Sequence, residues 1–169
     1  MFYRAQEKKL GQTLLPGLFW GRMPFLQILF LFFWRYLDRK TSTLDPALRA
    51  LVQVRVAQLN WCAFCIDINA LNLLKRTNSL YKVEHLPDWK NNTTFSIQEK
   101  AVLNYVEQVT EIEIQISAEL MQELKVHLSD DQIVELTALI SFQNMSAKFN
   151  AALNIPSQGM CKIPSKSNS

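Results

Sequence analysis

Apolar residues recur every three or four positions along most of this chain, with polar residues between them. In one segment the apolar positions are Leu48, Leu51, Val52 and Val56, a spacing that gives a helix one buried face. Similar spacing predicts six helices, over residues 25–39, 46–59, 62–76, 97–109, 117–127 and 130–153. The pattern therefore predicts an all-α fold.

Polar residues and a proline support the starts of these helices. The sequences Ser96-Ile-Gln-Glu99 and Ser129-Asp-Asp-Gln132 are capping boxes. In each, the serine oxygen accepts a backbone N–H of the first turn, and the Glu or Gln side chain accepts the serine N–H. Pro46 suits the first turn of a helix, where its missing N–H has no cost.

Three short stretches are predicted to interrupt the helices. Asn78 and Ser79 end the third helix, and residues 84–94 form a polar connector. Residues 112–116 alternate like a strand, but one short segment cannot build a sheet, so we expect a connector there as well.

Glycine is absent from residues 22–158, and the chain has four glycines in all. A long stretch without glycine favours helices joined by polar caps, because glycine usually supplies sharp turns. It also excludes the phosphate-binding P-loop and the dinucleotide-binding Gly-x-Gly-x-x-Gly motif.

The first 42 residues are rich in aromatic and basic side chains, and residues 23–34 carry no charge. This uncharged run is shorter than the ~20 residues that a membrane-spanning helix needs. It could be a buried core helix, a subunit contact or an interfacial membrane anchor. The run Phe30–Trp34 is apolar on all sides, which favours a core helix or a subunit contact over a membrane.

Charge divides the chain into three parts, at residues 1–42, 43–156 and 157–169. The first part has seven Lys and Arg against two Asp and Glu, whereas the central part has nine against thirteen. An acidic central domain disfavours nucleic acid as a partner. The last part lacks apolar periodicity, so we expect a flexible tail.

Cys62 and Cys65 form a C-x-x-C pair in the sequence Asn60-Trp61-Cys62-Ala63-Phe64-Cys65. Two sulfurs so spaced at a helix start can form a disulfide with little motion, and the helix dipole acidifies a thiol there. A zinc site needs four ligands, for which only His85, His127 and Cys161 are available. The C-x-x-C pair has three interpretations: a redox pair, half of a zinc site, or two inert core residues. The redox interpretation is preferred.

The segment from Leu44 to Asp67, with its C-x-x-C pair, resembles the carboxymuconolactone decarboxylase-like family. Within that family it resembles the alkylhydroperoxidase D-like branch that carries C-x-x-C. The similarity extends over residues 43–156 and includes Ser129–Leu136 and Ala151–Pro156.

This resemblance implies a single all-α domain of about six to eight helices, assembled as a trimer or hexamer. It implies thiol-dependent reduction of hydroperoxides or disulfides, with a thiol or disulfide reductant as partner and no metal or other cofactor. Cys65 would attack the peroxide and Cys62, the more exposed cysteine, would resolve the sulfenic acid as a disulfide. The expected location is the cytoplasm.

Two positions depart from the family's proton relay. A glutamate twelve residues before the first cysteine is replaced by Ala50, and a histidine four residues after the second cysteine is replaced by Asn69. Alanine carries no proton and asparagine is not a base at neutral pH. Peroxidase activity by the usual relay should therefore be slow or absent. The alternative is an inactive family member that serves as an interaction module.

No other residue is an obvious substitute for the relay. Gln53 is not a base, and Asp67 points away from Cys65 on an ideal helix and is expected in solvent. His85 could fold back, whereas His127 belongs to the end of a helix. The aromatic residues beside the sulfurs, Trp61 and Phe64, could line an apolar pocket but are more simply core residues.

Overall fold

The computed structural model describes residues 11–161, which form eight α-helices and contain no strand. The helices are α2 (Leu15–Trp20), α3 (Pro24–Leu37), α4 (Pro46–Leu59), α5 (Ala63–Thr77), α6 (Tyr81–His85), α7 (Ile97–Thr110), α8 (Ala118–His127) and α9 (Asp130–Ala152). The all-α prediction is confirmed, and each of the six helices predicted from periodicity is present with ends close to those expected.

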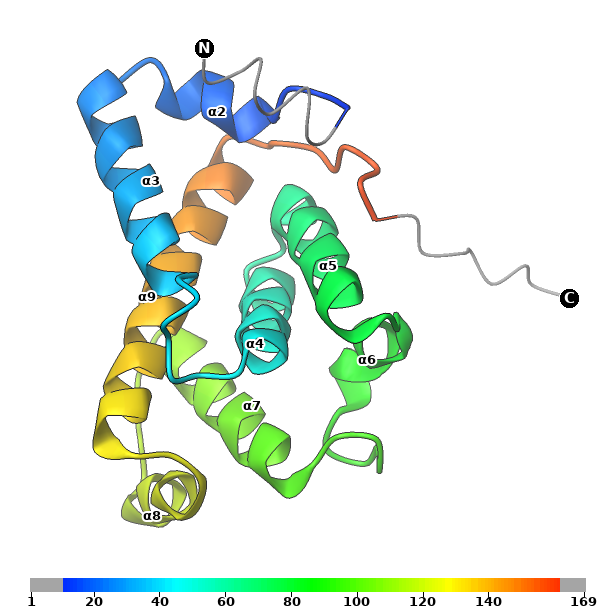
Figure 1. Ribbon diagram of the computed structural model, residues 1–169, viewed down its shortest axis with the longest axis vertical. Coiled ribbons are helices and arrows are strands. Elements are labelled where there is room, and N and C mark those ends of the chain that lie inside the picture. Colours follow the sequence, from blue (N-terminus) through cyan, green and yellow to red (C-terminus); the bar gives the residue numbers. More distant parts are fainter. Residues whose placement is uncertain (1–10, 162–169) are drawn as a thin grey trace, which may run out of the picture.

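Helix α4 lies at the centre of the fold and packs against α5, α7 and α9 (Figure 1). Its side chains Val52 and Val56 are fully buried and belong to the main hydrophobic core, to which α7 contributes Val102 and α9 contributes Leu136 and Ile140. Each such side chain stabilises the fold by about 1.5–3 kcal/mol when it leaves water. The central position of α4 fixes the start of α5, where the two close cysteines lie.

The predicted caps are present at the helix starts. Both capping boxes form, with Ser96 and Glu99 at α7 and with Ser129 and Gln132 at α9. The Asp45 carboxylate accepts two backbone N–H groups of α4, beside Pro46 in the first turn. These contacts are local in sequence, which is why the pattern of polar residues predicted them.

The connector predicted over residues 84–94 is more ordered than expected. It contains the end of α6 and a short 3-10 helix, Leu86–Asp88. Leu86 and Trp89 are buried in a second core cluster, and the Trp89 indole N–H donates to Glu107 on α7. The stretch is polar on average, but Leu86 and Trp89, one helical turn apart, attach it to the core.

Helix α3, for which the sequence favoured a core helix or a subunit contact, is buried on one side only. Phe30 packs between Trp20 and Phe142, but the opposite side of the helix faces solvent. Phe25 and Phe32 are 74% and 70% exposed. A short helix laid against one side of α9 can bury only one side within a single chain (Figure 1). No helix in residues 11–161 combines the length and apolar character needed to cross a membrane.

Candidate functional site

Cys62 and Cys65 are joined by a disulfide, with a Sγ–Sγ distance of 2.15 Å and Cα atoms 5.2 Å apart. Cys62 is the N-cap of α5, and its sulfur accepts the backbone N–H of Cys65 at 3.2 Å. Both sulfurs therefore lie at the positive end of the α5 dipole, which stabilises a negative charge.

A tight turn at the end of α4 places Cys62 at this position. The N–H of Trp61 donates to the Gln58 carbonyl and the N–H of Cys62 donates to the Ala57 carbonyl, both at 3.1 Å. This is the Schellman pattern, in which the residue after the helix C-cap adopts the left-handed conformation. Trp61 does so, with φ of 53°, and its side chain is 88% exposed. Trp61 consequently does not line a pocket at the sulfurs, whereas Phe64 is buried beside them.

The disulfide is buried, which differs from the expected exposure of Cys62. Cys62 is 1% exposed and Cys65 is 2% exposed. Both belong to a small apolar cluster with Ala57 of α4 and Ala147 of α9. The cluster is completed by four side chains from outside the central helices, which we call the terminal cover: Leu14, Leu15, Ile155 and Met160.

Gln158 ties the two halves of the terminal cover together. Its side-chain oxygen accepts the backbone N–H of Leu15 at 2.9 Å, and its side-chain nitrogen donates to the Thr13 carbonyl at 3.0 Å. The N-terminal and C-terminal segments thus lie side by side over the start of α5 (Figure 1). Access to the disulfide depends on how firmly these segments are held.

Asp67 holds the C-terminal half of the cover, whereas the sequence suggested a solvated residue. Its carboxylate accepts the hydroxyl of Ser157 at 2.9 Å and the backbone N–H groups of Gln158, Met160 and Cys161 at 2.9, 3.0 and 2.6 Å. Residues 157–161, expected to begin a flexible tail, are therefore anchored; residues 162–169 lie outside the described part of the chain.

These contacts also decide the charge of Asp67. Burial by itself raises the pKa of this carboxyl group, but the hydrogen bonds from the C-terminal segment outweigh burial and lower the pKa below its ordinary value. Asp67 is consequently ionised at neutral pH and is not a proton donor or acceptor for the cysteines. Its role is to anchor the chain.

Ala50 and Asn69, which occupy the positions of the family's relay, do not form a substitute for it. The side-chain N–H of Asn69 donates to the Gln53 carbonyl at 3.2 Å and links α5 to α4. Ala50 is fully buried in the second core cluster, with Ala70. Neither residue supplies a base to the sulfurs.

Asn150 of α9 was not singled out by the sequence, yet its side chain contacts the disulfide. Its Nδ2 donates to the Cys65 sulfur at 3.3 Å, and the side chain is buried. A second Schellman turn ends α9, with Asn154 left-handed at φ of 50° and the N–H of Ile155 donating to the Asn150 carbonyl. The one signal for Asn150 in the sequence is that a polar residue occupies a position that the helical pattern assigns to the buried face.

The remaining candidates lie elsewhere or are held by other contacts. His85 stacks on Tyr81, and His127 ends α8 as expected. The pKa of the Cys161 thiol is raised by burial and by the charge of Asp67, so this thiol stays protonated. Within residues 11–161, no group of three or more Cys, His, Asp or Glu side chains could hold a metal ion.

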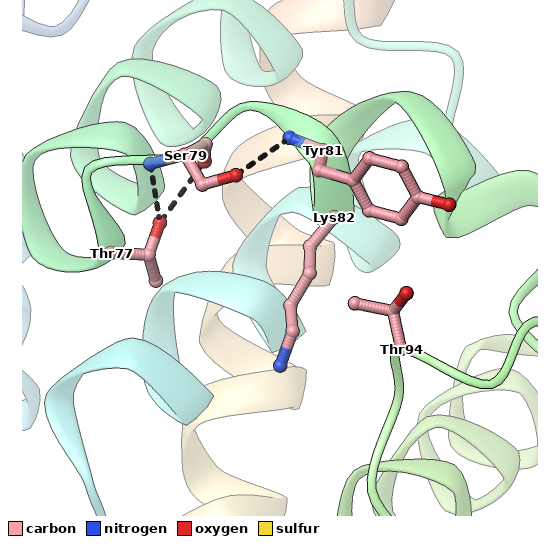
Figure 2. A pocket seen from close by; sticks show the side chains of 5 residues that line it. All are labelled: Thr77, Ser79, Tyr81, Lys82 and Thr94. Carbon is pink, nitrogen blue, oxygen red and sulfur yellow. Dashed lines mark hydrogen bonds between the residues drawn. The ribbon is translucent and has the colours of Figure 1, made fainter.

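One surface hollow, of about 500 Å³, is lined by residues from the end of α5, the start of α6 and the loop before α7. Figure 2 shows its lining, in which Thr77, Ser79 and Tyr81 are joined by local hydrogen bonds and Lys82 lies opposite Thr94. Lys82 forms an ion pair with Glu99. None of these residues belongs to the cluster around the disulfide, so this hollow is separate from the candidate site.

Comparison with known proteins agrees with this fold and site. The sequence profile described as the carboxymuconolactone decarboxylase family matches residues 25–108. The protein YnjA of Escherichia coli (strain K12) is 41% identical over 156 residues, which cover 92% of this chain and 86% of YnjA. The chain belongs to the carboxymuconolactone decarboxylase family.

Solved structures share the arrangement of the helices at low sequence identity. A peroxidase-related protein of Ralstonia eutropha JMP134 with the alkylhydroperoxidase AhpD core has a TM-score of 0.83 at 15% identity, covering 94% of this chain and 84% of that one. The debrominase Bmp8 has a TM-score of 0.82 at 18% identity, with the same two coverages, 94% and 84%. These similarities establish an AhpD-like fold, and a fold alone does not define an activity.

Proposed function

We propose that this protein is a thiol-dependent oxidoreductase that reduces hydroperoxides, with Cys62 and Cys65 alternating between a dithiol and a disulfide. The observation that carries the proposal is the disulfide itself, which joins two cysteines at the N-terminus of α5 in a family member with an AhpD-like fold. Cys65 is the attacking residue and Cys62 the resolving residue in this proposal.

The reaction balances with a hydroperoxide as the oxidant. The Cys65 thiolate attacks the terminal peroxide oxygen, the O–O bond breaks, and the alkoxide leaves and takes up a proton to become the alcohol. Cys65 is then a sulfenic acid, which the Cys62 thiol attacks to form the disulfide and release water. A dithiol reductant restores the pair by thiol–disulfide exchange and becomes a disulfide itself.

The surroundings of the pair support thiolate chemistry but not fast proton transfer. The helix dipole and the Asn150 amide both stabilise negative charge at Cys65. General-base assistance, which is worth about 10²–10⁴ in rate, has no residue to supply it at Ala50 or Asn69. We therefore propose slow peroxide reduction. An inactive interaction module remains the alternative for a chain that lacks the relay.

Burial of both sulfurs restricts the substrates of the pair. A reductant or a hydroperoxide must pass the terminal cover to reach Cys62 or Cys65. The hydrogen bonds of Asp67 and Gln158 to the terminal segments hold the cover in place. We propose that the cover opens during each cycle, and that bulky partners react more slowly than small thiols and small hydroperoxides. The cytoplasmic location stays a prediction.

The exposed side of α3 supports the proposed homo-oligomer. We define the α3 face as Phe25, Ile28, Leu29, Phe32 and Tyr36, five exposed side chains at helical spacing. With the neighbouring exposed side chains, the face leaves on the order of 800 Å² of apolar surface in water, counting roughly 200 Å² for a whole large side chain. A single chain rarely exposes a patch of that size, and it equals the area that each partner buries in a standard interface.

A groove beside the α3 face can receive side chains of another copy. A groove of about 390 Å³ runs between α3 and α9 and is lined by Leu26, Phe33, Phe142 and Met145, among others. A neighbouring copy in a closed assembly can place its exposed aromatic residues in this groove. We therefore propose that a second copy of this chain covers the α3 face within the trimer or hexamer that the family resemblance implies.

A steady-state assay with an organic hydroperoxide and dithiothreitol tests the proposed function. The wild type and Cys161→Ser should consume hydroperoxide, because Cys161 is not one of the two reacting thiols. Cys65→Ser should consume none. In the absence of dithiothreitol, Cys62→Ser should consume one hydroperoxide per chain and then stop with Cys65 as a sulfenic acid, because no second thiol is present to resolve it. Full steady-state turnover in both Cys62→Ser and Cys65→Ser would show that the mechanism is wrong, and no turnover in the wild type would favour the interaction module.

A further inference from the structure

The side-chain amide of Asn150 is in contact with the disulfide at one end only. Its Nδ2 lies 3.3 Å from the Cys65 sulfur, which as part of a disulfide can only accept a hydrogen bond. Its Oδ1 is buried and has no hydrogen-bond partner in the described part of the chain. A buried carbonyl oxygen without a donor is unfavourable, so the disulfide state leaves this amide half satisfied.

Reduction of the disulfide supplies what the amide lacks. A dithiol that reduces the pair becomes a disulfide and leaves one thiolate and one thiol at this site, and the remaining proton goes to solvent. The hydrogen bond from Nδ2 then ends on an anionic sulfur and becomes charge-assisted, which makes it about twice as strong. The new S–H group gives Oδ1 a donor, because both sulfurs lie at the same end of α5.

We propose that Asn150 is a catalytic residue that stabilises the reduced pair, by donating a hydrogen bond to the Cys65 thiolate and by accepting a hydrogen bond from the Cys62 thiol. The inference rests on the proposed thiol–disulfide cycle and deepens it, since it assigns to α9 the role of stabilising the attacking sulfur. The backbone of Asn150 is fixed by the turn at the end of α9, so the amide keeps its place as the sulfurs separate.

Other groups near the pair do not offer this stabilisation. Among the described residues, the hydrogen bonds to the two sulfurs come from the backbone N–H of Cys65 and the Asn150 amide. Asp67 faces the C-terminal segment, and Lys148 of α9 is exposed. On α4, the guanidinium of Arg55 is paired with Glu107. The Asn150 amide and the start of α5 are thus the groups positioned to stabilise charge on the Cys65 sulfur.

Asn69 provides a matched control for Asn150. Both residues are buried asparagines, Asn69 within α5 and Asn150 on α9, but the Asn69 amide donates to the Gln53 carbonyl rather than to sulfur. Replacing Asn69 by alanine removes a structural hydrogen bond of similar kind without touching the sulfurs. A difference between Asn150→Ala and Asn69→Ala therefore separates an effect on the cysteines from a general loss of packing.

Two measurements on the full-length protein test the inference without any peroxide. The first is the equilibrium between disulfide and dithiol in dithiothreitol buffers; the second is the Cys65 pKa, followed by thiolate absorption in a Cys62→Ser background. Asn150→Ala should shift the equilibrium toward the disulfide on the order of tenfold and should raise the Cys65 pKa by about one unit. Asn69→Ala should leave both quantities unchanged.

A second variant keeps the test decisive if Asn150→Ala does not fold. Asn150→Asp has nearly the same shape but replaces the N–H donor by an oxygen, so it should shift both quantities in the same direction and further. A folded Asn150 variant with the wild-type equilibrium and Cys65 pKa would overturn the inference. If both quantities change in the Asn150 variants but the wild type consumes no hydroperoxide, the peroxidase proposal alone is overturned. If the disulfide cannot be reduced and re-formed, both proposals are overturned.

Discussion

The carboxylate of Asp67 accepts a 2.6 Å hydrogen bond from the backbone N–H of Cys161, 94 residues further along the chain. Asp67 lies two residues after Cys65, so the same turn of α5 that carries the Cys65 sulfur also anchors the segment that covers it. Stability and access to the disulfide are therefore linked through one side chain.

Replacement of Asp67 by asparagine should loosen the terminal cover. The variant loses a charged acceptor, which should lower the free energy of unfolding by about 1.5–3 kcal/mol. It should also accelerate reduction of the disulfide by dithiothreitol, because the cover opens more often. Denaturant unfolding and stopped-flow reduction measure the two effects. Ser157→Ala, which removes only one of the hydrogen bonds to Asp67, should show a smaller change in both.

The contribution of Asp67 should depend on pH in a defined direction. Its pKa in the folded protein lies below the value of about 3.9 for an unfolded chain. The ionised carboxylate therefore contributes stability above pH 4, and this contribution is lost as the pH falls through the folded-state pKa. The stability difference between wild type and Asp67→Asn should be constant from pH 5 to 8 and shrink below about pH 4. A difference that grows on acidification would contradict the assignment.

Trp61→Gly should stabilise the protein, although most tryptophan-to-glycine changes destabilise. Trp61 has a left-handed backbone conformation, which costs a non-glycine residue about 1–2 kcal/mol, and its exposed side chain contributes little packing. We expect a rise of about 2–4 °C in the melting temperature. Trp61→Ala serves as the control and should show no such rise, because alanine meets the same backbone penalty.

Restoring the relay should separate proton transfer from thiol chemistry. Ala50→Glu combined with Asn69→His should increase kcat/KM for a hydroperoxide, by up to about 10²–10⁴ if the relay forms. Ala50→Glu alone should destabilise the fold, because Ala50 is fully buried and a lone carboxylate there has no partner. Ala50→Gln with Asn69→His is the control without a carboxylate. An unchanged rate in a folded Glu–His variant would indicate another proton path or another function.

Assembly through the α3 face should respond to charge on that face. Phe25→Lys combined with Phe32→Lys should convert the oligomer to a smaller species in sedimentation velocity, because two buried charges cost several kcal/mol per contact. Ile112→Lys is a matched control, since Ile112 is exposed elsewhere on the molecule. A monomeric wild type that binds anionic vesicles, with binding lost in the Phe25→Lys, Phe32→Lys variant, would instead favour a membrane surface as the occupant.

The order of the helices and their starts could be predicted because they depend on residues three or four positions apart. The capping boxes at Ser96 and Ser129 and the pairing of Cys62 with Cys65 are all of this kind. The sequence left open whether α3 is a core helix or a subunit contact, because a run that is apolar on all sides reports hydrophobicity, not the number of neighbours available to cover it.

The sequence by itself determined an all-helical chain with a redox-capable cysteine pair at a helix start. Tertiary structure alone decided that Asn150 contacts Cys65, that Asp67 anchors residues 157–161, and that α3 leaves an apolar face in solvent. The physical reason is distance along the chain. The periodicity of a helix is written within a few residues, whereas these contacts join side chains and backbone groups more than 80 positions apart.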